Sequence, residues 1–248
     1  MFNIAEYRNS KKPLSDYLPW AMFIKEGVLL NKDGSFQKIY RFRGPDLDSS
    51  TKTEFVAARA RFNNVIKQLG SNWCIHFEAR RRKSKTYYKS NFENEAAAYF
   101  DLERQQNFEQ EKNQYETDYY LSLTCLTPED TKGKLETVFY ENLPKLKASD
   151  YKRYLDEFEA ICDKIGDSLE VFMPRFVALD DAQTLTYLHD CISNRNVEMQ
   201  APEVPMYIDA LITDTSLACG RHPKLGDEYM DIISFRGCLL YTSDAADE

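Results

Sequence analysis

The segment from Gly27 to Gly44 constrains the fold more than any other part of the sequence. Two runs rich in apolar and β-branched residues flank the dipeptide Asp33-Gly34. Because glycine tolerates positive φ, this dipeptide favours a tight turn between antiparallel strands. Pro45 then ends the second strand, since it has no N–H to give to a sheet. The pattern predicts a β-hairpin, and with it an antiparallel sheet.

A helix is predicted to begin at Thr51. Thr51 and Glu54 have the spacing of a capping box, in which each side chain accepts a hydrogen bond from the other residue's backbone N–H. Apolar residues then recur at helical spacing up to Leu69, and Gly70 is predicted to stop the helix in a left-handed conformation. On this helix we expect Phe62 to be buried against the sheet. A strand is predicted over residues 72–82.

The remaining pattern alternates between helices and strands. The helix over 151–165 is the most amphipathic; Phe158 should be buried on it, and Gly166 should end it. Asp180 or Asp181 should cap a helix that continues to about Ile192. The other predicted elements are a polar helix over 92–116, strands over 118–126, 204–212 and 228–237, and an extended segment over 172–179.

This order predicts an α+β fold, with a largely antiparallel sheet and amphipathic helices packed on it. Residues 1–237 are expected to form the domain, with a candidate subdomain boundary near 126–148. The sequence shows no internal repeat.

Composition and charge exclude some classes of protein. Hydrophobic residues make up 43% of the chain and aromatic residues 13%, which is too apolar for a disordered protein. No apolar run is long enough to cross a membrane, and the first residues do not have the pattern of a secretory signal. The six scattered cysteines are expected to be reduced thiols in a cytosol. The net charge is −8, yet residues 1–89 carry an excess of Lys and Arg and residues 90–248 an excess of Asp and Glu.

The sequence has no pattern for nucleotide chemistry. Its one Gly-Lys pair, Gly133-Lys134, is followed by Leu135 where a phosphate-binding loop needs Ser or Thr, and Pro128 stands where the first glycine belongs. We therefore expect that this chain does not hydrolyse ATP and binds no cofactor.

Metal and nucleophile patterns are equally weak. Cys74 and His76 would share one face of a strand, whereas His189 and Cys191 would point to different sides of a helix, so the two pairs do not predict a metal site. Cys219 is close in sequence to a histidine, but a nucleophile and its base usually meet through the fold. No catalytic, cofactor-binding or metal-ligating residue is predicted.

A basic run with interleaved tyrosines is the candidate interaction patch. Arg and Lys beside Tyr87 and Tyr88 could bind acidic phospholipid or nucleic acid, and a solvated loop at a strand end is the alternative. The patch consists of Arg80, Arg81, Arg82, Lys83, Lys85 and Lys89.

Several stretches together resemble a known family. They are DYLPWAMFIKEGVLLNKDGSFQKIYRFRGPDLDSST, RFNNVIKQLGSNWCIHFEARRR, FMPRFVALDDAQTLTYLHDCIS, VPMYIDALI and HPKLGDEYMDIISFRG. This combination, spread over residues 14–237, is similar to the N-terminal portion of TrbE/CagE-type ATPases of the VirB-type conjugation and type IV secretion machinery of bacteria.

The resemblance implies an N-terminal α+β domain that mediates assembly, in a large cytoplasmic ATPase docked at the inner membrane. ATP and Mg²⁺ would then belong to a C-terminal domain with Walker motifs, which has no counterpart in this chain. The implied partners are other channel subunits and the cytoplasmic face of the inner membrane, and self-association is compatible with the resemblance.

The end of the chain differs from the rest. Residues 238–248, CLLYTSDAADE, have no periodicity and resemble translated sequencing-adaptor read-through. We interpret them as a non-native tail, and the chain as a product truncated before the ATPase domain. Exposed side chains are expected from Ser243 to Glu248.

Two other functions remain open from the sequence. A standalone nucleotide hydrolase is disfavoured by the missing phosphate-binding loop. A nucleic-acid-binding domain that uses the basic N-terminal side is disfavoured by the acidic remainder of the chain and a pI of about 5.1.

Overall fold

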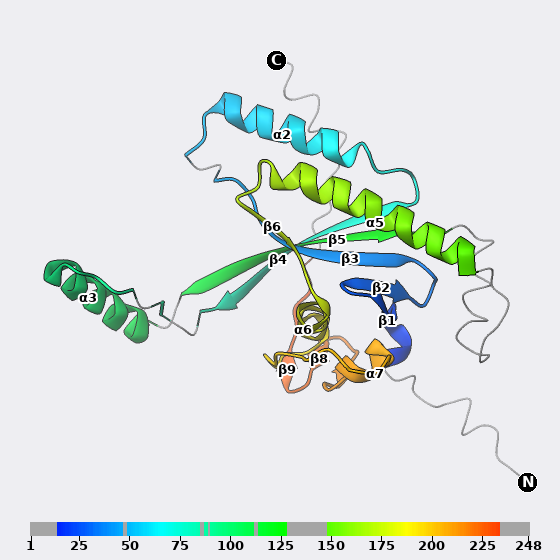
Figure 1. The fold of residues 1–248 in the computed structure, drawn as a ribbon. Coiled ribbons are helices and arrows are strands. Elements are labelled where there is room, and N and C mark those ends of the chain that lie inside the picture. Colours follow the sequence, from blue (N-terminus) through cyan, green and yellow to red (C-terminus); the bar gives the residue numbers. More distant parts are fainter. Residues whose placement is uncertain are drawn as a thin grey trace, which may run out of the picture.

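A six-stranded antiparallel sheet with helices on both faces organises the molecule (Figure 1). The structure is a computed structural model that describes residues 14–46, 49–84, 87–88, 90–111, 114–127 and 148–233. The strand order is β1-β2-β3-β5-β4, and β6 pairs with β3 beyond the end of β2. The strands are β1 (Trp20–Lys25), β2 (Val28–Asn31), β3 (Phe36–Arg43), β4 (Trp73–Lys83), β5 (Tyr115–Cys125) and β6 (Arg175–Ala178).

The helices divide between the two faces of the sheet. Helices α2 and α5 cover one face, and α6 and α7 lie on the other (Figure 1). A second, three-stranded antiparallel sheet follows α7. The helical elements are η1 (Leu14–Tyr17), α2 (Lys52–Ile66), α3 (Glu95–Glu111), α5 (Ala148–Glu170), α6 (Asp181–Ile192) and α7 (Ile208–Ile212), and the small sheet contains β7 (Leu217–Ala218), β8 (Lys224–Leu225) and β9 (Glu228–Tyr229). The predicted α+β class with antiparallel pairing is confirmed.

The predicted hairpin is present as β2 and β3. Gly34 has a φ of 83°, which is the left-handed conformation that its turn requires. Asp33 supports the turn, because its side chain accepts a hydrogen bond from the backbone N–H of Ser35 at 3.0 Å. Strand β1 was missed by the sequence reasoning; it pairs with β2 through a short turn at Gly27 and has irregular register.

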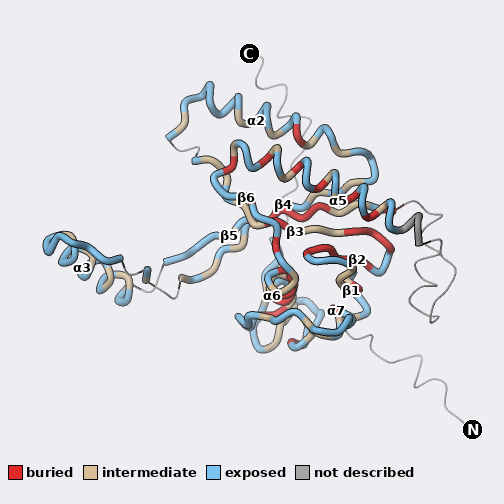
Figure 2. Tube along the Cα trace, in the orientation of Figure 1, coloured by how far each residue is buried: buried red, intermediate tan, exposed pale blue. Residues whose placement is uncertain are grey.

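Two hydrophobic cores lie on opposite faces of the sheet (Figure 2). The first is between the sheet and α2 and α5, and the second is between the sheet and α6 and α7. Alternate residues of β3 supply both, as strand geometry requires: Phe36 and Tyr40 enter the first core, and Ile39 enters the second. The chain after the predicted subdomain boundary therefore packs on the same sheet as the chain before it, and most of that boundary, residues 128–147, lies outside the described residues.

Helix α2 begins as predicted and ends earlier. Thr51 and Glu54 form the capping box, with the Thr51 backbone N–H donating to Glu54 Oε2 at 2.8 Å. Phe62 is partly buried rather than fully buried; it faces the sheet, and its ring centroid is 5.6 Å from that of Phe77. The predicted left-handed stop is wrong. The helix ends at Ile66, its C-cap Lys67 is right-handed, and Gly70 is not among the positive-φ glycines of the described chain.

Helix α5 is longer than predicted. Phe158 is 2% exposed, which confirms its predicted burial. Gly166 does not end the helix, because buried contacts continue past it to Leu169, which is fully buried. A Cβ at Gly166 would lie 3.7 Å from the Phe176 ring and 3.9 Å from the Tyr40 ring. The glycine therefore lets two aromatic side chains approach the helix, and tertiary packing outweighs its preference for a helix end.

Some other predicted elements have different ends or types. The strand predicted over 204–212 is wrong; Ile208 and Ile212, one helical turn apart, are both buried in the second core as part of α7. The strand predicted over 228–237 is reduced to β9, and 234–237 lie outside the described residues, as does the tail at 238–248. Helix α3 is shorter than predicted, since β5 begins at Tyr115.

Gly27→Ala should destabilise the fold. Gly27 has a φ of 68°, and a Cβ there would lie 2.7 Å from the backbone oxygen of Leu179. The left-handed conformation alone costs an alanine about 1–2 kcal/mol, and the contact with a backbone atom adds to this. We expect urea unfolding to show a loss of at least about 1 kcal/mol. Gly44→Ala is the control, because nothing lies within 4 Å of its Cβ position, and an equal loss in both variants would contradict the prediction.

Candidate interaction surface

The four described members of the predicted basic patch do not share one surface. Arg80, Arg81, Arg82 and Lys83 all belong to β4, where successive side chains point to opposite faces of the sheet. Arg80 and Arg82 point to the face that carries α6, and Arg81 and Lys83 point to the α2 face. Lys85 and Lys89, the other two predicted members, lie outside the described residues.

Arg80 is held inside an ion-pair network. Its guanidinium group lies over the rings of Tyr120 and Tyr187, at 5.4 and 4.9 Å from their centroids. Its Nη1 donates to Asp190 Oδ2 at 3.2 Å, and its Nε donates to Glu78 Oε1 at 2.9 Å. The side chains of Arg80 and Asp190 are 11% and 8% exposed. Arg80 therefore joins β4 to α6 and is not available to a partner.

Arg82 is occupied in the same way. It donates to the same Asp190 oxygen at 3.2 Å and to Asp118 Oδ2 at 2.7 Å. Asp118 also pairs with Arg41 of β3. Burial alone would raise the pKa of Asp118, but hydrogen bonds from Arg82 and Arg41 outweigh it, so this pKa is lowered. On this face of β4 and β5, the arginine side chains are therefore neutralised by neighbouring carboxylates.

The opposite face of the same two strands has a different chemistry. Beyond the part of β5 that pairs with β3, strands β4 and β5 continue alone as a two-stranded arm (Figure 1). We call the α2-side surface of these two strands, from Phe77 and Tyr119 to the outer end of the arm, the aromatic–basic face. Its members are Phe77, Ala79, Arg81 and Lys83 of β4 and Tyr115, Thr117 and Tyr119 of β5.

All members of the aromatic–basic face are exposed, and the set contains no carboxylate. Phe77 is 51% exposed and Tyr119 is 40% exposed. Both rings contact Phe42 of β3, with centroids 6.1 and 5.8 Å away. Arg81 lies over the Tyr115 ring, 4.5 Å from its centroid. Exposed aromatic groups beside unpaired positive charge are typical of an interaction surface.

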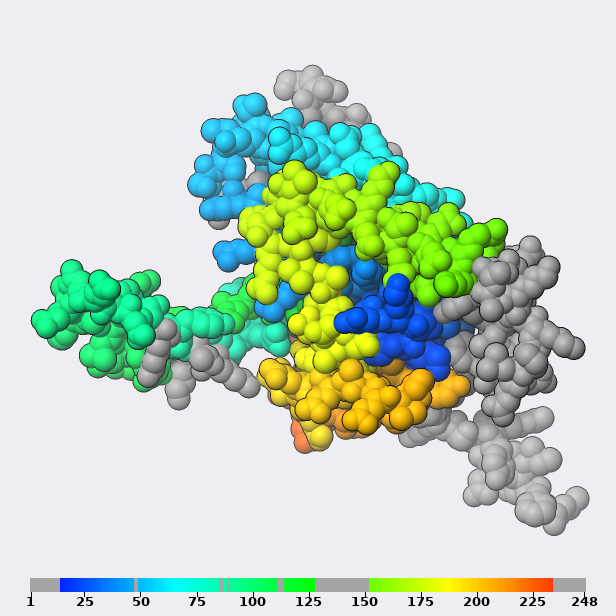
Figure 3. Space-filling model, in the orientation of Figure 1, coloured from blue at the N-terminus to red at the C-terminus, as the bar shows by residue number. Residues whose placement is uncertain are grey.

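Helix α3 stands at the tip of the arm, clear of the main body (Figure 3). None of its described side chains is buried (Figure 2). Helix α3 contacts Tyr87, which follows β4 in the chain: the Tyr87 hydroxyl donates to Asp101 Oδ1 at 2.5 Å, and its ring centroid is 5.5 Å from that of Phe108. Tyr99 and Glu103, one turn apart, lie on the opposite side of the helix from that contact.

The outer side of α3 is apolar and acidic. Tyr99 is 70% exposed, Phe100 is 65% exposed and Leu102 is 52% exposed. The helix sequence, EAAAYFDLERQQNFEQE, contains five acidic residues and one arginine. The sequence predicted this helix as polar, and it gave no indication that the helix would stand apart from the core.

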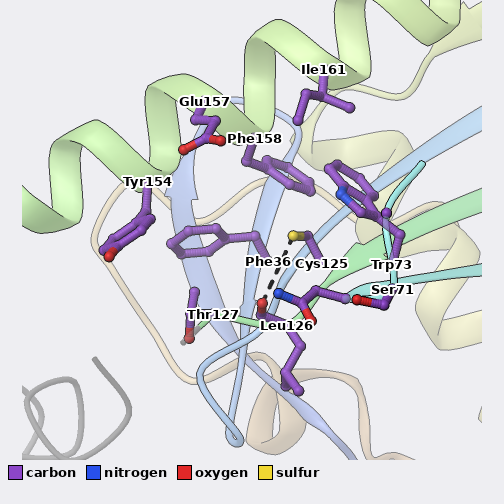
Figure 4. A pocket seen from close by; sticks show the side chains of 12 residues that line it. Phe36, Ser71, Trp73, Cys125, Leu126, Thr127, Tyr154, Glu157, Phe158 and Ile161 are labelled. Atoms are coloured by element: carbon purple, nitrogen blue, oxygen red, sulfur yellow. Dashed lines mark hydrogen bonds between the residues drawn. The ribbon is translucent and has the colours of Figure 1, made fainter. Parts of the chain in front are cut away.

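A small pocket lies between α5 and the ends of β4 and β5 (Figure 4). Its volume is about 260 Å³, which is below the usual range for ligand pockets. Phe158 and Trp73 stack in its wall, with ring centroids 5.4 Å apart. Burial raises the pKa of the Cys125 thiol in this wall to about 11, so that thiol is protonated at neutral pH. The lining combines these aromatic rings with polar side chains, among them Ser71, Thr127 and Glu157.

A second polar cluster resembles a catalytic triad only superficially. His189 is 2% exposed, and its Nε2 lies 3.2 Å from Asp214 Oδ2. Ser193, however, shares a 2.9 Å hydrogen bond with Thr215 and accepts one from the Arg195 backbone N–H, so it is not paired with the imidazole. No nucleophile is therefore activated by a base here. The cluster joins the end of α6 to the segment after α7.

The Asp214 carboxylate should make stability depend on pH. Burial alone would raise the pKa of Asp214, but hydrogen bonds from Thr215, His189 and Ser193 outweigh it and lower this pKa to about 2. Because the pKa is lower in the folded state, the stabilisation is complete above the unfolded pKa of about 4 and is lost as pH falls toward 2. We expect Asp214→Asn to be less stable than the parent by about 1–2 kcal/mol at pH 6 in urea unfolding. The difference should narrow below pH 4, and a difference that is constant between pH 6 and 3 would contradict this.

Cys74 Sγ is 3.9 Å from His76 Nδ1 on one strand face, as predicted. Within the described ranges, no group of three or more His, Cys, Asp and Glu side chains is placed to hold a metal ion. Nor does any helix in the described part of the chain have the length and apolarity that a membrane crossing requires.

An antiparallel α+β domain with an exposed arm is a class of fold and does not identify one protein, and comparisons with known proteins give the family. Residues 27–133 match the family described as "Type IV secretion system ATPase VirB4/TrbE, N-terminal domain". The first part of a probable conjugal transfer protein TrbE of Sinorhizobium fredii (strain NBRC 101917 / NGR234) is 31% identical over 141 residues, which are 56% of this chain and 95% of that relative. The chain belongs to the VirB4/TrbE family and corresponds to its N-terminal part.

A longer relative matches nearly the whole chain. The "Conjugal transfer protein TrbE" of Rhizobium radiobacter is 26% identical over 253 residues, which are 96% of this chain. The chain spans about a third of the length of that relative, since the match covers 31% of it. The family resemblance inferred from the sequence is confirmed.

Proposed function

We propose that this chain is the assembly module of a type IV secretion ATPase of conjugal DNA transfer, and that it acts by binding other components of the machinery. The observation that carries the proposal is helix α3. Its apolar side chains Tyr99, Phe100 and Leu102 are more than half exposed, at the tip of an arm that projects from the sheet. Most of the stability of a helix in a protein comes from packing of its apolar face. The exposed apolar side chains of α3 therefore indicate a partner that packs against them.

The proposed partners are other channel subunits, further copies of the ATPase, and the cytoplasmic face of the inner membrane. The chain would be in the bacterial cytoplasm and peripheral to that membrane. Arg81 and Lys83 suit such a place, because juxtaposed basic side chains attract acidic lipid headgroups. A net charge of −8 opposes a nucleic-acid partner.

Catalysis is not part of the proposed role. ATP and Mg²⁺ would be bound by the part of the longer relatives that lies beyond the matched segment. The purified chain should therefore release no phosphate from ATP above background, because nothing in its sequence can cradle the phosphates and hold the metal ion. ATP turnover that follows the protein through gel filtration would contradict this, and would favour a standalone nucleotide hydrolase.

Co-purification tests the assembly role. The tagged chain would be produced in cells that contain a conjugal transfer system of the Rhizobium radiobacter type, and channel and ATPase subunits recovered with it would be identified by mass. With the double variant Tyr99→Asp, Phe100→Asp, we expect the recovered amount of these subunits to fall at least about ten-fold. A carboxylate on the helix face would lose its hydration in the interface, and this desolvation is unfavourable.

A matched control separates this effect from general damage. Tyr17 and Val171 are also exposed, at 70% and 83%, but lie away from α3. The variant Tyr17→Asp, Val171→Asp should recover the subunits as the parent does, and both variants should keep the parent's circular dichroism. Equal recovery by the parent and the α3 variant would overturn the assembly role of α3.

A further inference from the structure

The aromatic–basic face and the outer side of α3 are complementary in charge and alike in apolar content. The face presents Arg81 and Lys83 among exposed aromatic rings. The helix presents Glu95, Tyr99 and Glu103 in one row, at i, i+4 and i+8, beside Leu102. Positive charge meeting negative charge around an apolar centre is the arrangement that fixes register and partner in protein interfaces.

Within one copy the two surfaces do not meet. Helix α3 contacts Tyr87 of its own chain through Asp101 and Phe108, and its acidic and apolar row points away from that contact. Tyr99 is 70% exposed and Phe77 is 51% exposed, which would not be so if the helix covered the face of its own chain. The two surfaces can therefore satisfy one another only between copies.

We propose that α3 of one copy docks on the aromatic–basic face of a second copy of this chain. The inference rests on the assembly role proposed above and names the partner of α3. The helix has 17 residues and is about 25 Å long. A reciprocal exchange around a two-fold axis buries this contact twice, which closes the assembly and leaves neither surface open.

Glu95 and Glu103 then lie against Arg81 and Lys83 of the partner copy, and Tyr99 and Leu102 pack on the rings of Phe77 and Tyr119. The charges lie at the edge of the contact and determine which surfaces meet, while the aromatic and aliphatic side chains supply the buried area. Raising the salt concentration should weaken the contact moderately, because the charged pairs are partly screened.

Charge reversal tests the contact in the full 248-residue chain. Sedimentation velocity over about 1–100 μM would measure its self-association. We expect Arg81→Glu with Lys83→Glu to weaken association at least about ten-fold, and Glu95→Lys with Glu103→Lys to do the same. A chain that carries all four changes should associate again, since the charges are complementary in the reversed sense.

The control carries the same change of charge at another surface. Arg59 and Arg61 are exposed on α2, so Arg59→Glu with Arg61→Glu should leave association at the parent's level. A parent that is monomeric throughout, unchanged association in the reversal variants, or no recovery in the four-fold variant would each overturn the proposal. If the parent is monomeric and the variant Tyr99→Asp, Phe100→Asp loses the channel subunits in co-purification, the assembly role stands. Only the second copy is then excluded as the partner of α3.

Discussion

Phe158→Ala should lower the free energy of unfolding by about 3–5 kcal/mol, because truncating a buried phenylalanine removes its transfer energy and leaves a cavity. The ring is 2% exposed, lies 5.6 Å from the Phe36 ring and stacks on Trp73 with centroids 5.4 Å apart. It joins α5 to β3 and β4, so the surroundings can close the cavity only by moving a helix against the sheet. Urea unfolding followed by circular dichroism would measure the loss.

Phe100→Ala provides the comparison, since it is the same substitution on an exposed ring. Phe100 is 65% exposed on α3 and should cost no more than about 0.5 kcal/mol. A loss below about 1 kcal/mol at Phe158 would mean that α5 does not pack on the sheet as described.

Asp190→Ala should cost about 3 kcal/mol, at the lower end of the range for removing one partner of a buried ion pair. The Asp190 side chain is 8% exposed and accepts hydrogen bonds from both Arg80 and Arg82. Its loss leaves Arg80 buried with only part of its charge compensated, because Glu78 remains 2.9 Å away. Urea unfolding is again the measurement.

A second variant tests whether the stability lost in Asp190→Ala comes from the missing ion-pair attraction or from the Arg80 charge that is left uncompensated. Arg80→Met combined with Asp190→Leu should regain part of the stability lost in Asp190→Ala, since no buried cation is left without its partner. Asp227→Ala is the exposed control: Asp227 pairs with Lys224 at 3.6 Å on the surface, and its removal should cost no more than about 0.5 kcal/mol. Equal losses at Asp190 and Asp227 would contradict a buried network.

The candidate site was predictable in part. The sequence identified the basic run, and the period of two along a strand already separates Arg80 and Arg82 from Arg81 and Lys83. It could not show which face α6 would cover, because Asp190 is more than 100 residues away from the arginines in the chain. The exposed side of α3 was missed, since its composition resembles that of any polar surface helix.

The features that the sequence determined by itself are those that depend on contacts between residues close together in the chain. The turn at Asp33-Gly34, the capping box at Thr51 and the helix cap at Asp180, one of the two residues predicted for it, join residues at most four positions apart. They therefore form in the structure as the pattern predicts. Only the tertiary structure decided the rest. Gly166 continues a helix because the rings of Tyr40 and Phe176 pack against it. Within the strand predicted over 204–212, Ile208–Ile212 form a helix because the second core takes up Ile208 and Ile212. The arm stands free because β3 ends at Arg43 while β4 and β5 continue, and burial against distant segments outweighs local preference wherever the two disagree.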